Sequence, residues 1–582
     1  MLVIHQRIRF FGEIMMIELF QKLGKLLVLM AITSSCASEP SYFIPPSSPP
    51  TQAVAIEVLS PPVKDPVPSP LLPTMEEVVP TEMNPLPTLT PTIEITSTEI
   101  SESIPIGSGI SMDVLPTLQV PTLVSETQIP QVSPSPASEV FTVNTAPILY
   151  YAQAADTLPA VAVRFGVSPD DIKSSEPIPE TEFINPGQLL IIPRKLTNTT
   201  SSEHLIPDSE VVNSPSAVNF DAVSYADQAG GHLSTYEEWH LSTGMKSGAE
   251  IVMRVAIENS INPRLLLALL EYHTQLVTGQ PQSPDDIDYP MGYKLPSKKL
   301  LYNQLVWTVN QLSVGYYAYR EGRLTEVVFK DGISARLAPD LNAGTAALQY
   351  YFAQIYDSQE WLDAINTEYG FPALHNAMFG DPWKRSQSVE PLFPAGIQQP
   401  MLILPFMRNW TWAYTGGPHG AWEREGAYAA LDFAPGSTEA GCVESKAWAT
   451  AAAAGLVVRT GPGLVVIDLD GDGHEQTGWV LVYLHIAEKE RVPEGSWVAT
   501  GDPIGHPSCE GGYATGTHIH IARKYNGEWV PADGPLPFNL GGWIAHADER
   551  AYKGTLTRDG VTVTACTCSN AASFVTRTDK DP

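Results

Sequence analysis

Four histidines and one aspartate in the last third of the chain have types and spacings that suit a metal ion: His419, Asp432, His485, His518 and His520. His518 and His520 lie two positions apart in a segment with strand-like alternation, so both imidazoles are expected on the same face of a sheet. Several imidazoles and a carboxylate on one sheet face are poor core material, but they suit a divalent cation of the zinc type. A catalytic zinc ion keeps about three protein ligands and leaves one position for water. The other two groups would then be free for proton transfer.

The elements that must position these side chains are predicted to be β-strands. Residues 396–545 are rich in glycine and valine and contain short apolar runs, such as 463–468 and 478–485, that end at turns. His485 ends one such run, and a neighbouring strand would bring it to the two histidines at 518 and 520. We expect an all-β domain with an antiparallel sheet at 396–545, followed by a cysteine-containing tail at 546–582.

The segments that carry the five residues resemble the motifs of the M23 peptidases, the lysostaphin and LytM family: 416–420, 430–433, 483–486 and 515–521. The resemblance implies that His419, Asp432 and His520 bind one Zn²⁺ ion. It assigns catalysis to His485 and His518, and which of them is the base stays open. The implied substrate is a peptide bond in the stem or cross-bridge of peptidoglycan. Twelve residues separate His419 from Asp432, a wider spacing than the family commonly has, so we expect an insertion that keeps the two side chains close in space.

Residues 146–195 combine a strand, a capped helix start and a turn that leads into the apolar strand 189–192. This segment resembles a LysM domain over nearly its whole length. The resemblance implies a small α/β fold of the βααβ type that binds N-acetylglucosamine-containing glycans. The alternative is a folded spacer without a glycan-binding role.

The N-terminal segment 1–36 is predicted to be an export signal. Lys22 and Lys25 precede a short apolar run at 26–32, and small residues lead to Cys36. The segment 33–36 resembles a bacterial lipobox, which implies lipidation of Cys36 and a membrane anchor. An uncleaved signal anchor and a secreted protein without lipid are the alternatives, and Met15 or Met16 is an alternative start.

Residues 37–145 hold many of the 52 prolines and are rich in serine, threonine and glutamate. This composition cannot bury enough apolar surface to offset the entropy of ordering, so we expect a disordered, extended stalk. The net charge of −30 excludes a nucleic-acid partner, because no basic surface is available to neutralise phosphates. The charge fits a protein that is soluble outside a cell. The resemblances imply an extracytoplasmic, cell-wall-associated location.

A polar linker is predicted at 196–230, and an all-α domain at 231–395. The segments around 262–271, 315–317 and 341–345 resemble the lysozyme-like fold of lytic transglycosylases. That resemblance makes Glu271 a candidate general acid, because a carboxyl group beside an apolar helix can be held protonated by desolvation. A charge at the end of a leucine-rich helix is the alternative reading of Glu271.

Two further groups of residues invite a chemical interpretation. Cys442 and Cys509 lie in loops of the predicted sheet domain and are a candidate disulfide, although together with Cys566 and Cys568 they allow three connectivities. Asp468, Asp470 and Asp472 form part of a calcium-loop pattern, but the position of the bidentate glutamate is Trp479. A hairpin turn is therefore favoured there over weak Ca²⁺ binding.

The sequence as a whole predicts a multidomain, lipid-anchored or secreted zinc endopeptidase of the cell wall, directed to peptidoglycan by its LysM module. Two other functions remain open at this point. One is a catalytically inactive wall-binding or regulatory protein, and the other is a glycan-cleaving enzyme that uses Glu271.

Overall fold

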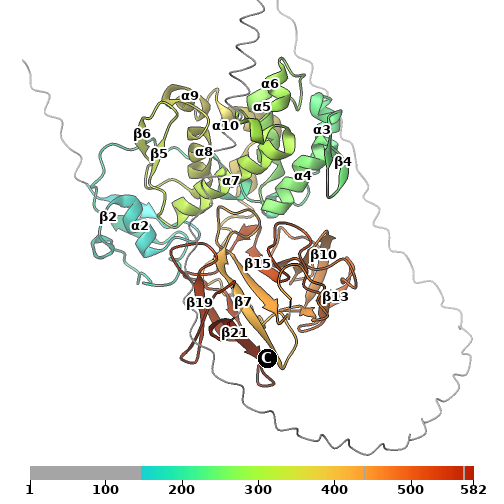
Figure 1. Cartoon of the computed structure of the whole chain (residues 1–582). Helices are drawn as coiled ribbons and strands as arrows, with labels where there is room; N and C mark the ends of the chain where they lie inside the picture. Colours follow the sequence, from blue (N-terminus) through green and yellow to red (C-terminus); the bar gives the residue numbers. More distant parts are fainter. Residues whose placement is uncertain (1–145, 438, 568–569, 582) are drawn as a thin grey trace, which may run out of the picture. The chain divides into compact units, whose positions relative to one another are not determined.

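The computed structural model describes residues 146–437, 439–567 and 570–581 (Figure 1). The predicted signal segment 1–36, the lipidation site Cys36, the alternative starts Met15 and Met16, the stalk 37–145 and Cys568 lie outside the described residues. Among the helices of the described part, none is long and apolar enough to cross a membrane.

The first described module packs one helix on a two-stranded sheet. The helix α2 begins after Thr157, whose side chain caps it, and ends at Gly166 with φ 65°. Where a second helix is expected, the structure has a single 3-10 turn, because the backbone becomes extended at Ile172 and Lys173 then bridges to Ile191. Val161 and Phe165 are fully buried beneath the antiparallel strands. The elements are β1 Ile148–Tyr151, α2 Leu158–Phe165, η1 Pro169–Asp171 and β2 Leu189–Ile192.

The middle region is helical, as predicted, and carries two short hairpins. A capping box between Ser247 and Glu250 starts α4, and Asn262 followed by Pro263 starts α5. The helices are α3 Ala222–Ala229, α4 Gly248–Asn259, α5 Pro263–Thr274, α6 Pro284–Asp288, α7 Leu301–Arg320, α8 Ala343–Ala353, α9 Ser358–Ala364, α10 Phe371–Phe379 and α11 Pro382–Ser386. The hairpins are β3 Glu237–His240 with β4 Gly244–Ser247, and β5 Glu326–Val328 with β6 Ser334–Arg336.

The segment for which the sequence suggests a polar linker belongs to this helical region. Ile206 and Val211 are buried in the same apolar cluster as the helices. Asp208 accepts hydrogen bonds from the Asn342 side chain and from the backbone N–H of Gly344 at the start of α8. A few apolar residues among many polar ones order this segment, together with the 3-10 turns η2 Asp208–Glu210 and η3 Pro215–Ala217.

The C-terminal region is an antiparallel sheet, as predicted. Within the described residues, nine strands join in the order β13-β10-β11-β12-β15-β8-β7-β21, with β16 paired to β15. Their bounds are β7 Trp410–His419, β8 Ala430–Pro435, β10 Gly455–Gly461, β11 Leu464–Asp468, β12 Trp479–Leu484, β13 Trp497–Val498, β15 Ile519–Tyr525, β16 Glu528–Trp529 and β21 Phe574–Arg577. A short pair, β9 Ala449–Thr450 and β14 Pro503–Gly505, lies beside it.

Residues 546–582, expected to be a tail, are part of this sheet region. β21 pairs with β7 along its first four residues and so extends the main sheet. The preceding strands form a second sheet in chain order: β17 Asn539–Leu540, β18 Trp543–Ala547, β19 Gly554–Arg558 and β20 Val561–Thr564. The alternation Val561-Thr562-Val563-Thr564 is a strand signal in this segment, directly before the cysteines.

The two faces of the main sheet have different partners. Ile519 and Ile521 of β15 lie in the cluster on one face, whereas Ala522 lies in the cluster that contains the helices. By strand alternation, His520 shares the face of Ala522. The helical and sheet regions fall within one compact unit of the chain.

The hairpin of β15 and β16 is bound to the helical region by polar contacts. The guanidinium of Arg320, at the end of α7, pairs with the carboxylates of Glu528 and Asp208, and all three groups are buried. The hydroxyl of Ser260 donates to the carbonyl oxygen of Gly527, and the backbone N–H of Trp529 donates to the hydroxyl of Tyr317. Because each of these buried polar groups has a hydrogen-bond partner, burying them does not incur the full free-energy cost of desolvation.

A second buried charge cluster supports β15 within the sheet. Glu475, in the loop between β11 and β12, accepts from Arg459 on β10 at 2.7 Å and from Lys524 on β15 at 2.8 Å. Burial alone would raise the pKa of Glu475, but the charges of Lys524 and Arg459 outweigh it and lower the pKa to about 2.

We expect replacement Glu475→Gln to lower the free energy of unfolding at pH 7 by about 3 kcal/mol, from the depressed pKa at 1.36 kcal/mol per pKa unit. A depressed carboxyl pKa contributes stability above the unfolded-state value of 4.5, and that contribution is lost as pH falls toward about 2. The difference between wild type and variant should therefore shrink below pH 4.5. Guanidinium unfolding at several pH values measures it, with the exposed Glu549→Gln as control. A difference in the free energy of unfolding that stays constant with pH would contradict the lowered pKa of Glu475.

Candidate metal centre

Three of the residues singled out from the sequence converge in space: His419, Asp432 and His520. His419 Nε2 lies 3.2 Å from Asp432 Oδ1, and His520 Nδ1 lies 3.4 Å from the same oxygen. The two ring nitrogens are 3.0 Å apart. All three side chains are buried. The three atoms therefore form a small triangle of potential ligands.

Strand register produces this triangle. Asp432 on β8 is directly opposite His520 on β15 and opposite Gly416 on β7, and His419 ends β7. Gly416 has no side chain because the carboxylate occupies that space: a Cβ there would lie 2.3 Å from Asp432 Oδ2. A Cβ on Gly417 would lie 2.6 Å from the backbone of Lys553. The glycines of this motif let the carboxylate and a neighbouring loop approach the strand.

Backbone carbonyls determine which ring nitrogens carry hydrogen. His419 Nδ1 lies 2.8 Å from the carbonyl oxygen of Gly417, and His520 Nε2 lies 2.9 Å from that of Ala421. Because a carbonyl oxygen can only accept, both of these nitrogens donate. In the neutral rings, His419 Nε2 and His520 Nδ1 then present lone pairs toward each other and toward the carboxylate.

This arrangement is unfavourable without a positive charge at its centre. Asp432 Oδ1 is buried, and it has no hydrogen-bond donor as long as both facing ring nitrogens are unprotonated. Burial would raise the pKa of Asp432, but the charge of His419 holds it well below the usual value. Burial would lower the pKa of His419, and Asp432 outweighs burial and raises it. Either a proton on His419 or a metal cation must therefore compensate the carboxylate, and metal binding would release that proton.

His485 and His518 lie beside the triangle with their rings 4.4 Å apart. His485 Nδ1 donates to the carbonyl of Glu510 at 2.8 Å, and His518 Nδ1 donates to that of Gly516 at 2.7 Å, so both Nε2 atoms are available. His518 Nε2 is 3.9 Å from Asp432 Oδ1. Burial lowers the pKa of His485 to about 4, assisted by the two neighbouring histidines, which leaves its ring neutral at pH 7.

The backbone of His485 is held in an uncommon conformation. Its φ is 62°, in the left-handed region that non-glycine residues seldom adopt. Its carbonyl accepts hydrogen bonds from the backbone N–H and the hydroxyl of Ser508, and the N–H of Ile486 donates to Gly463. Strained backbone of this kind persists where surrounding contacts over-determine it, commonly at functional sites.

The long spacing between His419 and Asp432 has a structural explanation. Within residues 420–429, Ala421 and Ala427 are buried in the cluster that contains the helices. A Cβ on Gly426 would lie 2.8 Å from Cβ of Ser313 on α7. The insertion therefore docks on the helical region, and its residue Ala421 supplies the carbonyl that orients His520.

The sequence did not point to Tyr552, whose ring stacks on His419 with centroids 4.1 Å apart. Tyr552 also exchanges backbone hydrogen bonds with Gly417 and Pro418. It lies in the segment expected to be a tail, and no local pattern marks it. The sequence also could not predict which backbone carbonyl groups orient the four rings, because every residue type has a backbone carbonyl group.

Glu271 does not join this site. It is buried at the end of α5, and its carboxylate accepts from the backbone N–H groups of Val277 and Thr278 and from the Thr278 hydroxyl. These contacts close the turn that follows the helix. They favour the alternative reading of Glu271 as a helix-terminal charge with a structural role.

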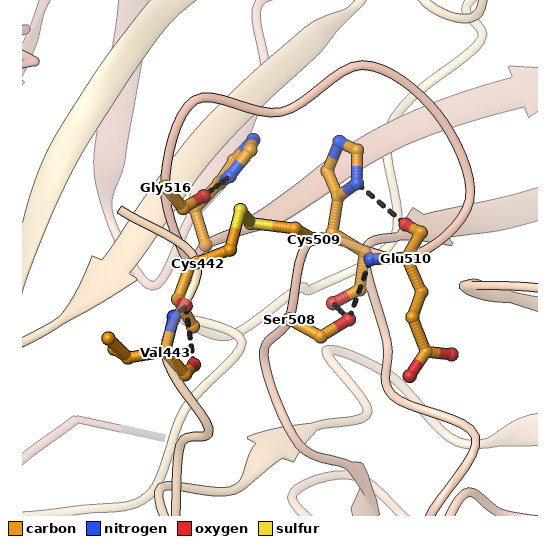
Figure 2. Close-up of a disulfide and its surroundings, with 9 residues drawn as sticks. Cys442, Val443, Ser508, Cys509, Glu510 and Gly516 are labelled. Atoms are coloured by element: carbon orange, nitrogen blue, oxygen red, sulfur yellow. Dashed lines mark hydrogen bonds between the residues drawn. A yellow bond between two sulfur atoms is a disulfide. The ribbon is translucent and has the colours of Figure 1, made fainter. Parts of the chain in front are cut away.

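The remaining candidate groups lie in loops of the sheet region. Asp468, Asp470 and Asp472 are close together in the connection from β11 to β12, where Asp468 accepts from the backbone N–H groups of Asp470 and Gly473. These are the hydrogen bonds of a turn, as the hairpin interpretation expects. Cys442 and Cys509 are joined by a disulfide (Figure 2).

Comparison with known proteins adds sequence relatives. Residues 204–392 match the family model described as LasA, N-terminal domain. Protease LasA of Pseudomonas aeruginosa strain UCBPP-PA14 is 24% identical over 317 residues, which cover 50% of this chain and 71% of that protein. Protease LasA of strain PAO1 is 23% identical over 313 residues, with the same shares covered.

Among solved structures, the M23 metalloprotease pseudoalterin from the deep sea has 23% identity and a TM-score of 0.25, covering 29% of this chain and 96% of that one. The catalytic domain of lysostaphin from Staphylococcus simulans has 23% identity and a TM-score of 0.16, covering 21% and 90%. These sequence matches establish that this chain is related to protease LasA.

Proposed function

We propose that the chain is a zinc-dependent endopeptidase that hydrolyses peptide bonds of peptidoglycan. The observation that carries the proposal is the triangle of His419 Nε2, Asp432 Oδ1 and His520 Nδ1, with edges of 3.0–3.4 Å. The motif resemblance to M23 peptidases and the relationship to protease LasA support the same reaction class.

Zinc is the cation that best suits this set of donors. Two neutral imidazoles and one carboxylate are a common ligand set for catalytic zinc, which keeps a further position open. Ligand atoms bonded to a tetrahedral ion at about 2.0–2.1 Å lie about 3.3–3.4 Å from one another. The measured edges are at or slightly below that separation.

The bound metal would supply Lewis-acid polarisation of the scissile carbonyl and of a water molecule. The chain's own part is to move protons. His485 and His518 each present a free Nε2, and each ring is fixed by its Nδ1–H hydrogen bond to a backbone carbonyl. One ring accepts the proton of the attacking water at its Nε2. Donation to the leaving amine or to the oxyanion needs a proton on Nε2, so it comes from the ring that has taken up a proton. Their ring separation of 4.4 Å places both groups within reach of one substrate.

In this proposal the rest of the chain brings the enzyme to the cell wall and keeps it there. The module at 146–195 binds N-acetylglucosamine-containing glycan and so keeps the enzyme on the wall. The segment before it exports the protein and, through Cys36, anchors it to a membrane by a stalk. The LysM resemblance and the lipobox resemblance are the support for these two roles.

Metal binding is the first testable consequence. After zinc loading and dialysis, we expect the full-length chain to hold about one zinc ion. The Asp432→Asn variant should hold less than about a tenth of that amount, because the amide replaces the anionic ligand. Elemental analysis of metal per chain measures this. Asp559→Asn is the matched control, since Asp559 is exposed in the β19–β20 turn. Wild-type protein without zinc, or full zinc in Asp432→Asn, would refute the ligand assignment.

Catalysis is the second consequence. We expect His485→Ala to retain zinc and to lose at least about a hundredfold in the release of peptide amines from peptidoglycan, because a proton-transfer group contributes that much. Glu271→Gln should keep the activity of the wild type if it folds.

Two other results would point elsewhere. A zinc-loaded wild-type protein that cleaves no peptidoglycan type would favour the regulatory alternative. Release of glycan fragments that is lost in Glu271→Gln would favour a glycan-cleaving enzyme instead.

A further inference from the structure

The segment around Cys509 holds the ring and the backbone of His485. The carbonyl oxygen of Glu510, the next residue, accepts a hydrogen bond from His485 Nδ1 at 2.8 Å. Ser508, the residue before, donates its backbone N–H to the carbonyl of His485 at 2.7 Å. Figure 2 shows Ser508 and Glu510 beside Cys509, with Cys442 and Val443 across the disulfide. Both neighbours of Cys509 thus contact the same histidine.

The segment around Cys442 holds the other histidine through Thr517. The Thr517 hydroxyl donates to the carbonyl of Val443 at 2.6 Å and accepts from the N–H of Val443 at 2.9 Å. The backbone N–H of Thr517 donates to the carbonyl of Gly441 at 3.1 Å. Thr517 lies between Gly516, whose carbonyl receives the His518 Nδ1–H, and His518 itself.

His518 itself contacts the Cys509 segment. The backbone N–H of His518 donates to the carbonyl of Ser508 at 3.3 Å. Both ring acceptors, Glu510 and Gly516, lie in the loop between β14 and β15 that contains Cys509. The disulfide joins this loop, across 67 positions of sequence, to the Cys442 segment, which bonds Thr517 beside the second acceptor.

From these contacts we infer that the Cys442–Cys509 disulfide is a positioning element for the His485 and His518 pair, and that it fixes their Nδ1–H tautomers without contributing to metal binding. The inference rests on the proposed function. A ring whose Nδ1–H loses its acceptor can rotate or change tautomer, and its Nε2 lone pair is then no longer aimed at the substrate.

The metal ligands are held independently of this disulfide. His419 and His520 donate to the carbonyls of Gly417 and Ala421, which lie in and directly after β7. His520 is further fixed by ladder pairing of β15 with β12 and β8. Loss of the disulfide should therefore separate catalysis from metal binding.

The test uses the full-length chain with both cysteines replaced, Cys442→Ser with Cys509→Ser, because thiol reductants would also bind zinc. We expect zinc content equal to that of the wild type, kcat lowered by about tenfold or more, and KM changed by less than about twofold. Thr517→Val keeps the disulfide and removes the hydroxyl that bonds Val443, so we expect a smaller fall in kcat. Ser445→Ala is the control, since its hydroxyl contacts only the neighbouring Ala447 N–H.

A second readout does not depend on activity. In protein labelled with ¹⁵N-histidine, the Nδ1–H signals of His485 and His518 should be protected from exchange in the wild type and lost in the double variant. The Nδ1–H signal of His419 should persist in both, because its acceptor Gly417 lies on another segment.

Unchanged kcat in the double variant would overturn the inference, and so would loss of zinc together with kcat. If the double variant does not fold, Thr517→Val decides: a lower kcat with full zinc supports the inference, and an unchanged kcat refutes it. A wild-type protein that binds zinc but cleaves no peptidoglycan would instead refute the proposed function, and the imidazole signals alone would then decide whether the disulfide positions the two rings.

Discussion

The buried carboxylate of Asp432 is the constraint on which the rest of the sheet region depends. One of its oxygens accepts no hydrogen bond, and two ring nitrogens with lone pairs lie within 3.4 Å of it. A charge in such surroundings is tolerable only beside a cation. The registers of β8 against β15 and β7 bring the three groups together, so every contact that keeps these strands aligned also serves the site.

The sequence was most informative where periodicity is local. Alternation around His518 and His520 placed both imidazoles on one face, and the structure confirms the antiparallel sheet and the helical region before it. The sequence did not predict the contacts between segments that are distant along the chain. The apolar residues at 205–212 are too few to predict order by themselves, and the insertion 420–429 is ordered by α7, more than a hundred positions earlier. The backbone acceptors of the four rings carry no signature in any side chain.

Strand β15 connects the candidate site to the helical region. Its first residues carry His520, and the turn at its other end is bound by Ser260, Tyr317 and Arg320. The Glu475 cluster supports the same strand from the side of β10. The insertion 420–429 makes a second connection, because it packs on the helices and orients His520 through Ala421. The helical region is thus part of the framework that positions His520, although it contributes none of the side chains in the triangle.

The glycines before His419 have a consequence for how variation in this protein would be interpreted. A side chain at Gly416 would collide with the carboxylate of Asp432, and one at Gly417 would collide with the backbone of Lys553. A saturation mutagenesis screen for activity would therefore score both glycines as being as intolerant as His419, even though neither provides a functional atom beyond its backbone. Separate measurements of protein abundance and of turnover would distinguish these glycines from His419. A replaced glycine that no longer fits depletes the folded protein, whereas a replaced site side chain leaves the protein abundant and inert.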